Sequence, residues 1–415
     1  MDEHRGLARD RKTLTRLPVI DLAPFVSGGG ADARRAAAKA LREACIDIGF
    51  FYLAGHGIAQ SEFDAIIAMG HRFFELSLDE KMKLHSNQSA ERLGYRPLGG
   101  PNPGATGDKA PDIKERFHMA REVLPGEPFD GRRDAGLSQW PEERVLPGFT
   151  SLMRAHIEAR CAVARHLARA FALSLDLAED AFDEIYRYPG GSVVLNYYPP
   201  IDPGAVRDAQ WSFSPHADYN AFTLLYQDQL GGLQVMNAAG DWIDVPFLAG
   251  TMVVNIGDLF QSWTNDLFTS TLHRVYNKGN AARISVPHFA SPNGAALIEC
   301  LPTCTGPGNP PRYKPIRAED FVKTMLAEAY RTGLPALGAK TEERLRKPSP
   351  RVAQAIERER ATEARLMITA DRVRNELASI AFASIGDWGP EGVTLKEKEA
   401  VALDPISNSS QRSES

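Results

Sequence analysis

Cysteine, long apolar runs and an excess of positive charge are all lacking in this sequence. Four cysteines in 415 residues are too few for the disulfide framework of a secreted domain. No run of about eighteen apolar residues occurs, so we expect no transmembrane helix. The amino-terminal stretch is charged and holds no apolar segment ahead of a small-residue cleavage site. We therefore expect a cytoplasmic protein with reduced thiols.

The charge balance also limits the partners. The chain has 48 basic and 53 acidic residues, a formal net charge of −5. This balance supplies no basic field that would attract nucleic acid or an anionic membrane. Neither a Walker-type phosphate loop nor a Gly-x-Ser-x-Gly elbow occurs, so nucleotide hydrolysis and serine-hydrolase chemistry lack support. We expect no membrane and no nucleic-acid partner, and the sequence does not fix the oligomeric state.

The pattern of apolar residues changes along the chain. The first part has helical periodicity, with a helix at Ser61–Phe74, a Gly/Pro-rich loop at Gly94–Gly107 and a long helix whose apolar stripe runs from Phe149 to Leu175. Short strands at close spacing then predict a mainly β fold with flanking helices, a sandwich or a jelly roll. These strands are expected at Val193–Tyr198, Phe222–Tyr226, Leu233–Met236, Trp242–Val245, Thr251–Ile256, Leu272–Tyr276 and Arg283–Phe289.

A His-x-Asp triplet is the most informative motif. Residues i and i+2 of a strand share a face, so His216 and Asp218 can offer a nitrogen and an oxygen to one ion. The pair alone also fits a polar pair at the end of a strand, so a third ligand is required. His273 is the candidate, and it would complete the two-histidine, one-carboxylate face of non-haem Fe(II) enzymes. His288 is a weaker alternative ligand.

Further cations are candidates for binding acids. Arg283 and Ser285 are again i and i+2, and a guanidinium beside a hydroxyl matches a carboxylate. The other interpretation of Arg283 is an exposed residue on an edge strand. Arg96, Lys114 and Arg116 suit either a carboxylated substrate or ordinary solvated loops.

Taken in order, these motifs resemble those of the Fe(II)/2-oxoglutarate-dependent oxygenases, in the isopenicillin N synthase-like branch. The resemblance covers about Leu17 to Gly333. It rests on His216-Ala217-Asp218, His273-Arg274-Val275, Arg283-Ile284-Ser285, Asn196-Tyr197-Tyr198-Pro199-Pro200 and Asn255-Ile256-Gly257-Asp258. Asn220 departs from the pattern, because relatives commonly have glycine there.

The resemblance implies a double-stranded β-helix core that binds Fe(II) and the cosubstrate 2-oxoglutarate. With O₂, such an enzyme hydroxylates or desaturates a small molecule and releases succinate and CO₂. Two alternatives stay open: a 2-oxoglutarate-independent iron oxidase of the isopenicillin N synthase type, and a non-catalytic jelly-roll binding protein. The implied metal ligands are His216, Asp218 and His273, and the implied cosubstrate residues are Arg283, Ser285 and Tyr198. Val275, Trp263 and Phe289 are candidates for an apolar lining, or for ordinary core.

Three regions follow from this interpretation. Residues 1–125 form the amino-terminal helical and strand region, and residues 126–338 form the jelly-roll catalytic core with its long bracing helix. Residues 339–415 form a charged helical tail whose end we expect to be disordered. Within the tail, Ala361–Lys396 has a limited resemblance to phage terminase small subunits, but no helix-turn-helix pattern precedes it. DNA binding is therefore not inferred.

Overall fold

The computed structural model describes residues 13–89, 92–98, 112–122, 138–200, 212–276 and 281–332. The chain divides into two units, Met1–Ala355 and Ile356–Ser415, and every described residue belongs to the first. The predicted boundaries after residues 125 and 338, and the predicted tail, lie outside the described residues and stay predictions.

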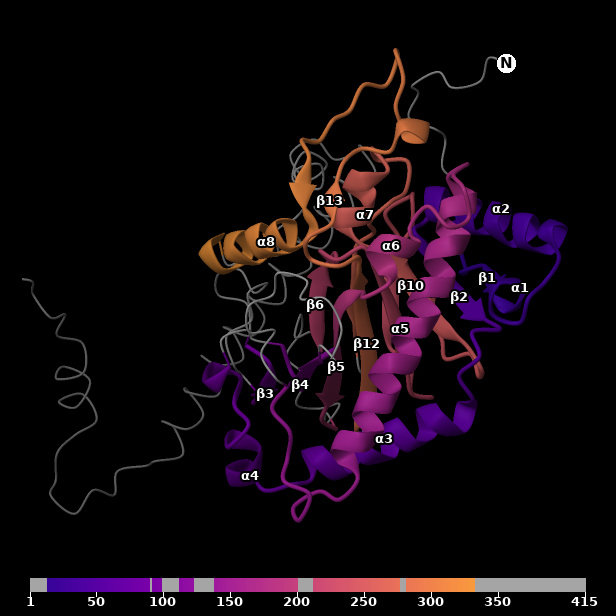
Figure 1. Cartoon of the computed structure of the whole chain (residues 1–415). Coiled ribbons are helices and arrows are strands. Elements are labelled where there is room, and N and C mark those ends of the chain that lie inside the picture. The colour runs from indigo at the N-terminus through magenta and orange to yellow at the C-terminus, as the bar shows by residue number, and fades with distance from the viewer. Residues whose placement is uncertain are drawn as a thin grey trace, which may run out of the picture. The chain divides into compact units, whose positions relative to one another are not determined.

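Two sheets of unequal size form the β core (Figure 1). The strands of the large sheet lie in the order β1 (Val19–Asp21), β2 (Phe50–Ala54), β10 (Met252–Ile256), β7 (Phe222–Gln227), β12 (Arg283–Ser291), β5 (Gly190–Tyr198), β4 (Glu115–Ala120) and β3 (Gly94–Arg96). Those of the small sheet lie in the order β6 (Phe213–His216), β11 (His273–Val275), β8 (Leu233–Met236) and β9 (Trp242–Val245). A short pair, β13 (Leu297–Ile298) and β14 (Ile316–Arg317), is separate.

Strand pairing is antiparallel throughout both sheets except between β1 and β2. The predicted fold class, mainly β with flanking helices around a jelly-roll core, is confirmed. The predicted loop at Gly94–Gly107 is wrong at its start, because Gly94–Arg96 pairs with β4 as the edge strand β3. Its Gly/Pro content hid a strand that depends on a partner rather than on local propensity.

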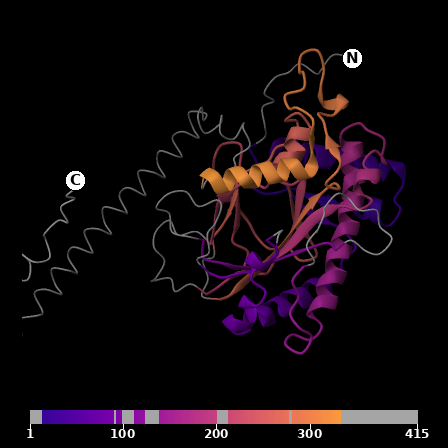
Figure 2. The same ribbon diagram turned by 60° about the vertical axis from the view of Figure 1, so that its left-hand side comes forward.

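Helices cover the outer face of the large sheet (Figures 1 and 2). The long helix α5 (Phe149–Ser174) runs along this face and matches the predicted apolar stripe. Helices α2 (Ala31–Asp47) and α3 (Gln60–Phe74) also contact this sheet. The remaining described helices are α1 (Ala23–Val26), α4 (Leu78–Met82), α6 (Asp183–Tyr186), α7 (Asp258–Trp263) and α8 (Ala318–Thr332), with single 3₁₀ turns at Ser86–Gln88 and Pro302–Cys304.

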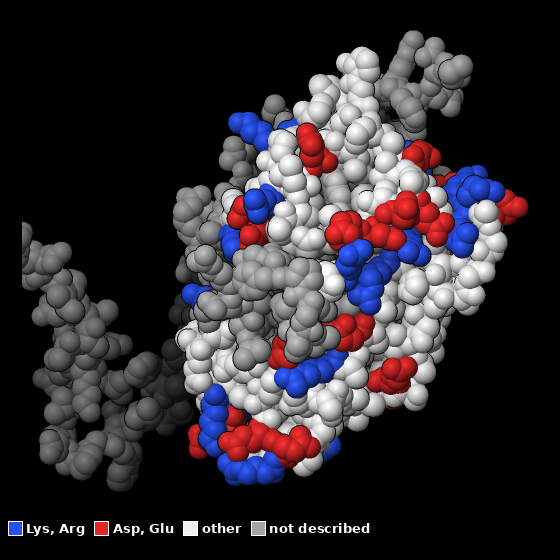
Figure 3. Space-filling view, viewed as in Figure 1, with Lys and Arg blue, Asp and Glu red and all other residues white. Residues whose placement is uncertain are grey.

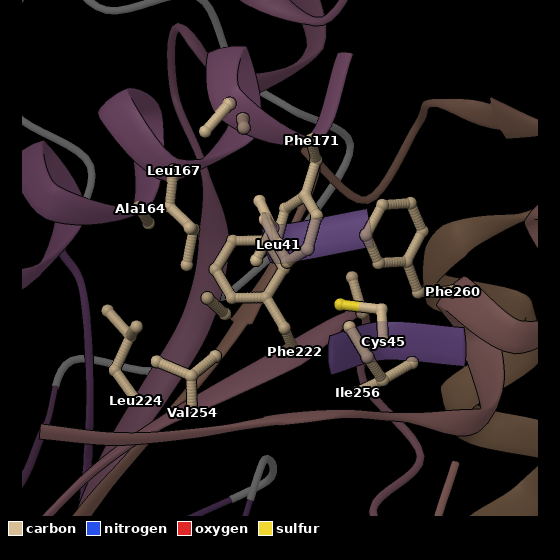
Figure 4. Packing of buried hydrophobic residues seen from close by; sticks show 14 of the residues in the cluster. Leu41, Cys45, Ala164, Leu167, Phe171, Phe222, Leu224, Val254, Ile256 and Phe260 are labelled. Atoms are coloured by element: carbon tan, nitrogen blue, oxygen red, sulfur yellow. The ribbon is translucent and has the colours of Figure 1, made fainter. Parts of the chain in front are cut away.

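Alternation along the strands of the large sheet separates two apolar layers. Between sheet and helices, Phe171 of α5 packs against Phe222 of β7 and Phe260 of α7, with ring centroids 5.2 and 4.8 Å away (Figure 4). Between the two sheets, Phe50 and Val253 join a second cluster with small-sheet residues. Each fully buried side chain of this kind stabilises the fold by roughly 2–3 kcal/mol. The face that meets the small sheet is called the inner face below.

Candidate active site

The structure brings the three predicted metal ligands together. His216 ends β6, Asp218 follows two residues later, and His273 begins β11, where it is the register partner of His216. One donor atom from each residue lies within 4.8 Å of the others. Asp218 Oδ1 is 3.8 Å from Nε2 of both histidines. These distances leave space for one ion between the three atoms, so the residues fit a divalent metal.

Backbone carbonyls fix the orientation of both imidazoles. His216 Nδ1 lies 2.8 Å from Ser214 O, and His273 Nδ1 lies 3.2 Å from Thr271 O. A carbonyl oxygen can only accept, so each Nδ1 carries the proton and donates it. Each Nε2 therefore presents its lone pair toward Asp218, as metal-binding histidines do.

The protonation states suit a cation. Burial, followed by the neighbouring His273, lowers the pKa of His216 to about 3. Burial acts to raise the pKa of Asp218, but the two imidazoles and two hydrogen bonds hold it below its usual range. At neutral pH the site thus contains a carboxylate and an unprotonated His216 imidazole, the forms that bind metal.

Two residues that sequence reasoning missed orient Asp218. Its Oδ2 accepts hydrogen bonds from Asn255 Nδ2 at 2.8 Å and from Thr223 Oγ1 at 2.5 Å, which turns Oδ1 toward the histidines. The Asn220 amide donates to Phe222 O and Thr223 Oγ1, so this departure from the family pattern supports the same network. Asn255 lies within a motif that carries the resemblance, whereas Thr223 gave no signal.

The predicted cosubstrate residues also meet. Arg283 is fully buried, and its register partner on β5 is Tyr198, whose ring centroid lies 4.7 Å from the guanidinium carbon. Tyr198 Oη lies 3.5 Å from Ser285 Oγ. Arg283 Nε donates to Gly231 O and Nη2 to Gln227 Oε1, but Nη1 has no hydrogen-bond partner within the described residues. A buried guanidinium with a free donor fits an anionic ligand.

Two family models match the chain. One, described as the non-haem dioxygenase in morphine synthesis N-terminal domain, matches residues 17–143, and the other, the 2OG-Fe(II) oxygenase superfamily, matches residues 189–292. A 2-oxoglutarate-Fe(II) type oxidoreductase, ppzC of Metarhizium majus, is 34% identical over 334 residues, which cover 76% of this chain and 88% of that protein. The chain belongs to the 2OG-Fe(II) oxygenase superfamily.

Other relatives agree with this assignment. Azadirone synthase LFS of Melia azedarach is 36% identical over 296 residues, covering 69% of this chain and 86% of that protein. A crystal structure of a full-length Neurospora crassa protein in complex with alpha-KG and thymine superposes with a TM-score of 0.67 at 26% identity, covering 79% and 100% of the two chains. This oxygenase is thus a 2-oxoglutarate-dependent dioxygenase, an oxidoreductase that uses Fe(II), 2-oxoglutarate and O₂ to hydroxylate or desaturate its substrate.

The three aromatic and aliphatic residues that could form either an apolar lining or ordinary core divide between these two roles. Val275 lies in the cluster between the two sheets, and Phe289 is the register partner of Thr223, which bonds Asp218. Trp263 does not line the site. It ends α7, which turns its ring into the helical layer against Phe182, 4.7 Å between centroids.

The alternative metal ligand His288 is also excluded by its position. It lies on the outer face of the sheet, buried beside Arg160 of α5. Arg160 donates to Leu224 O, Val286 O and His156 Nε2, each at 2.7 Å, and so joins the helix to the sheet. Burial, and then the charge of Arg160, lower the pKa of His288 to about 3.

This burial predicts a stability that falls in acid. Folded His288 stays neutral down to about pH 3, whereas the unfolded side chain binds a proton below its ordinary pKa of 6.5. Stability is therefore lost as the pH falls from 6.5, at about 1.4 kcal/mol per pH unit for one group. Urea unfolding of the metal-free protein between pH 6.5 and 4.5 measures the free energy of unfolding at each pH. In His288→Leu this free energy should fall less steeply with falling pH than in the native protein, by the slope that corresponds to about one bound proton. An equally steep dependence in the variant would contradict this assignment.

Proposed function

We propose that His216, Asp218 and His273 bind the Fe(II) of this dioxygenase through Nε2, Oδ1 and Nε2. The observation that carries the proposal is the convergence of these three donor atoms within 4.8 Å from two strands and a loop. Iron bound there supplies the chemistry that side chains lack, activation of O₂ coupled to decarboxylation of 2-oxoglutarate to succinate and CO₂. Three protein ligands leave positions for the cosubstrate and O₂.

Arg283, Ser285 and Tyr198 would hold the C5 carboxylate of 2-oxoglutarate. Support comes from the free Nη1 donor of Arg283 and from the two hydroxyls beside it, all on buried residues. Gln227 Oε1 and Gly231 O accept hydrogen bonds from the other two guanidinium nitrogens of Arg283. The guanidinium is therefore oriented before the ligand binds. A preoriented charge-assisted pair is the strong form of carboxylate binding.

The substrate would be a small molecule that reacts between the two sheets. Val275, Phe50 and the half-buried Phe289 provide apolar surface near the ligands, and the Phe50 ring lies 5.3 Å from that of His273. Apolar side chains there exclude water from the reacting centre. The Neurospora crassa neighbour was crystallised with thymine, which is consistent with a small-molecule substrate.

The structure says less about membranes and nucleic acid as partners. None of the helices among the described residues is long and apolar enough to span a membrane. On the face seen in Figure 3, Lys and Arg lie among Asp and Glu. Among the described residues of that face, no continuous basic patch of the kind that binds nucleic acid is seen. A cytoplasmic location and the lack of a nucleic-acid partner stay predictions.

Loss of a metal ligand tests the iron assignment. His216→Ala should lower iron content well below one per chain and abolish succinate formation, because two ligands hold Fe(II) too weakly. The measurements are metal analysis and anaerobic titration with Fe(II) and 2-oxoglutarate, followed by visible absorbance and then by succinate after O₂ is admitted. His71→Ala, on α3 away from the site, is the control. Full turnover in His216→Ala would refute the ligand assignment.

Loss of the guanidinium tests the cosubstrate assignment. Arg283→Met should raise the Kd for 2-oxoglutarate by about tenfold or more, the effect of removing a charge-assisted hydrogen bond. The Fe(II) affinity should stay close to that of the native enzyme, since Arg283 lies on a different strand from the three ligands. Anaerobic calorimetry measures both constants, with the surface variant Arg169→Met as control. An unchanged Kd for 2-oxoglutarate would place the cosubstrate elsewhere.

Loss of the Asn255 amide tests the orientation of Asp218. Asn255→Ala should weaken Fe(II) binding by about 10- to 100-fold, the usual effect of removing a group that orients a metal ligand. Anaerobic calorimetry with Fe(II) is the measurement. Asn293→Ala, which removes an amide bonded to Ile185 O, is the matched control and should bind Fe(II) as the native enzyme does. Equal affinity in both variants would mean that Asp218 needs no such support.

A further inference from the structure

A row of polar residues crosses the inner face of the large sheet. Gln227 of β7 is the register partner of Ser285 on β12, which pairs with Asn196 on β5. Asn196 pairs with Arg116 on β4, and Arg116 with Arg96 on β3. Directly opposite residues of neighbouring antiparallel strands project to the same face. The two arginines therefore share the face of the proposed cosubstrate site, at the edge formed by β3 and β4.

Lys114 joins this row from the residue just before β4. It lies two positions before Arg116, and its side chain is 6% exposed. Its ammonium lies over the ring of Phe213, on β6 of the facing sheet. The Phe213 ring in turn stacks on His216, with centroids 3.9 Å apart. Lys114 thus extends from the large sheet toward the small one. The Phe213 ring contacts both its ammonium and the proposed iron ligand His216.

The Lys114 ammonium has N–H donors that no described acceptor satisfies. Within the described part of the chain, Nζ makes no hydrogen bond, and the nearest carboxylate oxygen is Asp112 Oδ2 at 3.7 Å. Asp112 Oδ1 already accepts from the backbone amide and the hydroxyl of Ser214. An ammonium carries three donors, and a buried one without acceptors is costly.

The charges around Lys114 also favour an incoming anion. Burial lowers its pKa well below the ordinary value; Asp112 opposes this shift, and Arg116 and Arg96 add to it. A ligand with a single negative charge would supply the missing acceptors and offset the repulsion between the cations. Asp112 would repel a doubly charged phosphate more strongly than a singly charged carboxylate. A carboxylate therefore fits better than a phosphate ester.

We propose that Lys114 binds a carboxylate of the primary substrate, so that this dioxygenase oxidises a small organic acid. The inference rests on the proposed function, since it places the acid beside the iron site. It is distinct from cosubstrate binding, for which Arg283 offers its own free donor. The carboxylate would hold the substrate at the β3–β4 edge while its carbon skeleton extends between the sheets toward His216.

Matched ligand pairs test this. Short alkyl and arylalkyl carboxylates, such as hexanoate, 4-phenylbutyrate and indole-3-acetate, are each titrated beside the corresponding primary amide. Anaerobic calorimetry is done on the enzyme saturated with Fe(II) and 2-oxoglutarate, so that the Arg283 site is occupied. The best carboxylate should bind about tenfold or more tightly than its amide, as expected for a charge-assisted contact.

Variants assign that preference to the lysine. In Lys114→Met the ratio of amide Kd to carboxylate Kd should fall to near one, and in Lys114→Arg it should be largely retained. A purely structural lysine would change both Kd values together and leave their ratio unchanged. Lys83→Met removes an exposed lysine that pairs with Glu80 and should keep the native ratio.

The opposite results are equally clear. The proposal is overturned if no carboxylate of the panel binds, if amides bind as well as acids, or if Lys114→Met keeps the preference. It is also overturned if Lys114→Met raises the Kd of 2-oxoglutarate as much as the Kd of the carboxylate, since Lys114 would then bind the cosubstrate. The visible absorbance of the Fe(II)–2-oxoglutarate complex separates the two levels of proposal. Its absence from the native enzyme would refute the proposed function itself.

Discussion

The fixed orientation of one carboxylate is the constraint on which the site depends. Asp218 directs Oδ1 toward both imidazoles because Asn255 and Thr223, on neighbouring strands of the large sheet, hold Oδ2. His216 and His273 belong to the small sheet. The three donor atoms therefore converge only when the two sheets pack together. Burial of an acid is costly, and these hydrogen bonds offset that cost before any metal arrives.

The two faces of the large sheet illustrate how local alternation separates chemistry from support. On β12, Arg283 and Ser285 project to the inner face, whereas Val286 and His288 project toward α5. The outer face also holds a buried cation, Arg160, but carbonyl oxygens and a neutral histidine occupy two of its three nitrogens. Each arginine keeps one nitrogen without a hydrogen-bond partner among the described residues, but Arg160 lies in the layer that joins helix to sheet, whereas Arg283 lies on the inner face beside Tyr198.

The sequence made the short-range part of the site predictable. His216 with Asp218, and Arg283 with Ser285, share faces because strand alternation is local. The third ligand, His273, required the order of motifs along the chain. Thr223 was not predictable, because its hydrogen bond to Asp218, five residues earlier, depends on how the chain turns between the two residues. For Trp263 the sequence left apolar lining and ordinary core open, since nearness to His273 in sequence does not fix the direction in which a short helix turns its side chains.

Chemistry and substrate choice occupy different parts of one sheet. The proposed iron and 2-oxoglutarate residues lie on or beside its central strands and on the small sheet, within the span matched by the 2OG-Fe(II) oxygenase model. Lys114 and Arg116 come from the amino-terminal region and reach the same inner face only because β4 pairs with β5. Neither lies on the strands that carry Asn255 and Thr223, which orient Asp218. Residues on or beside β4, one strand in from the sheet edge, can therefore set the charge offered to a substrate without disturbing the proposed iron ligands.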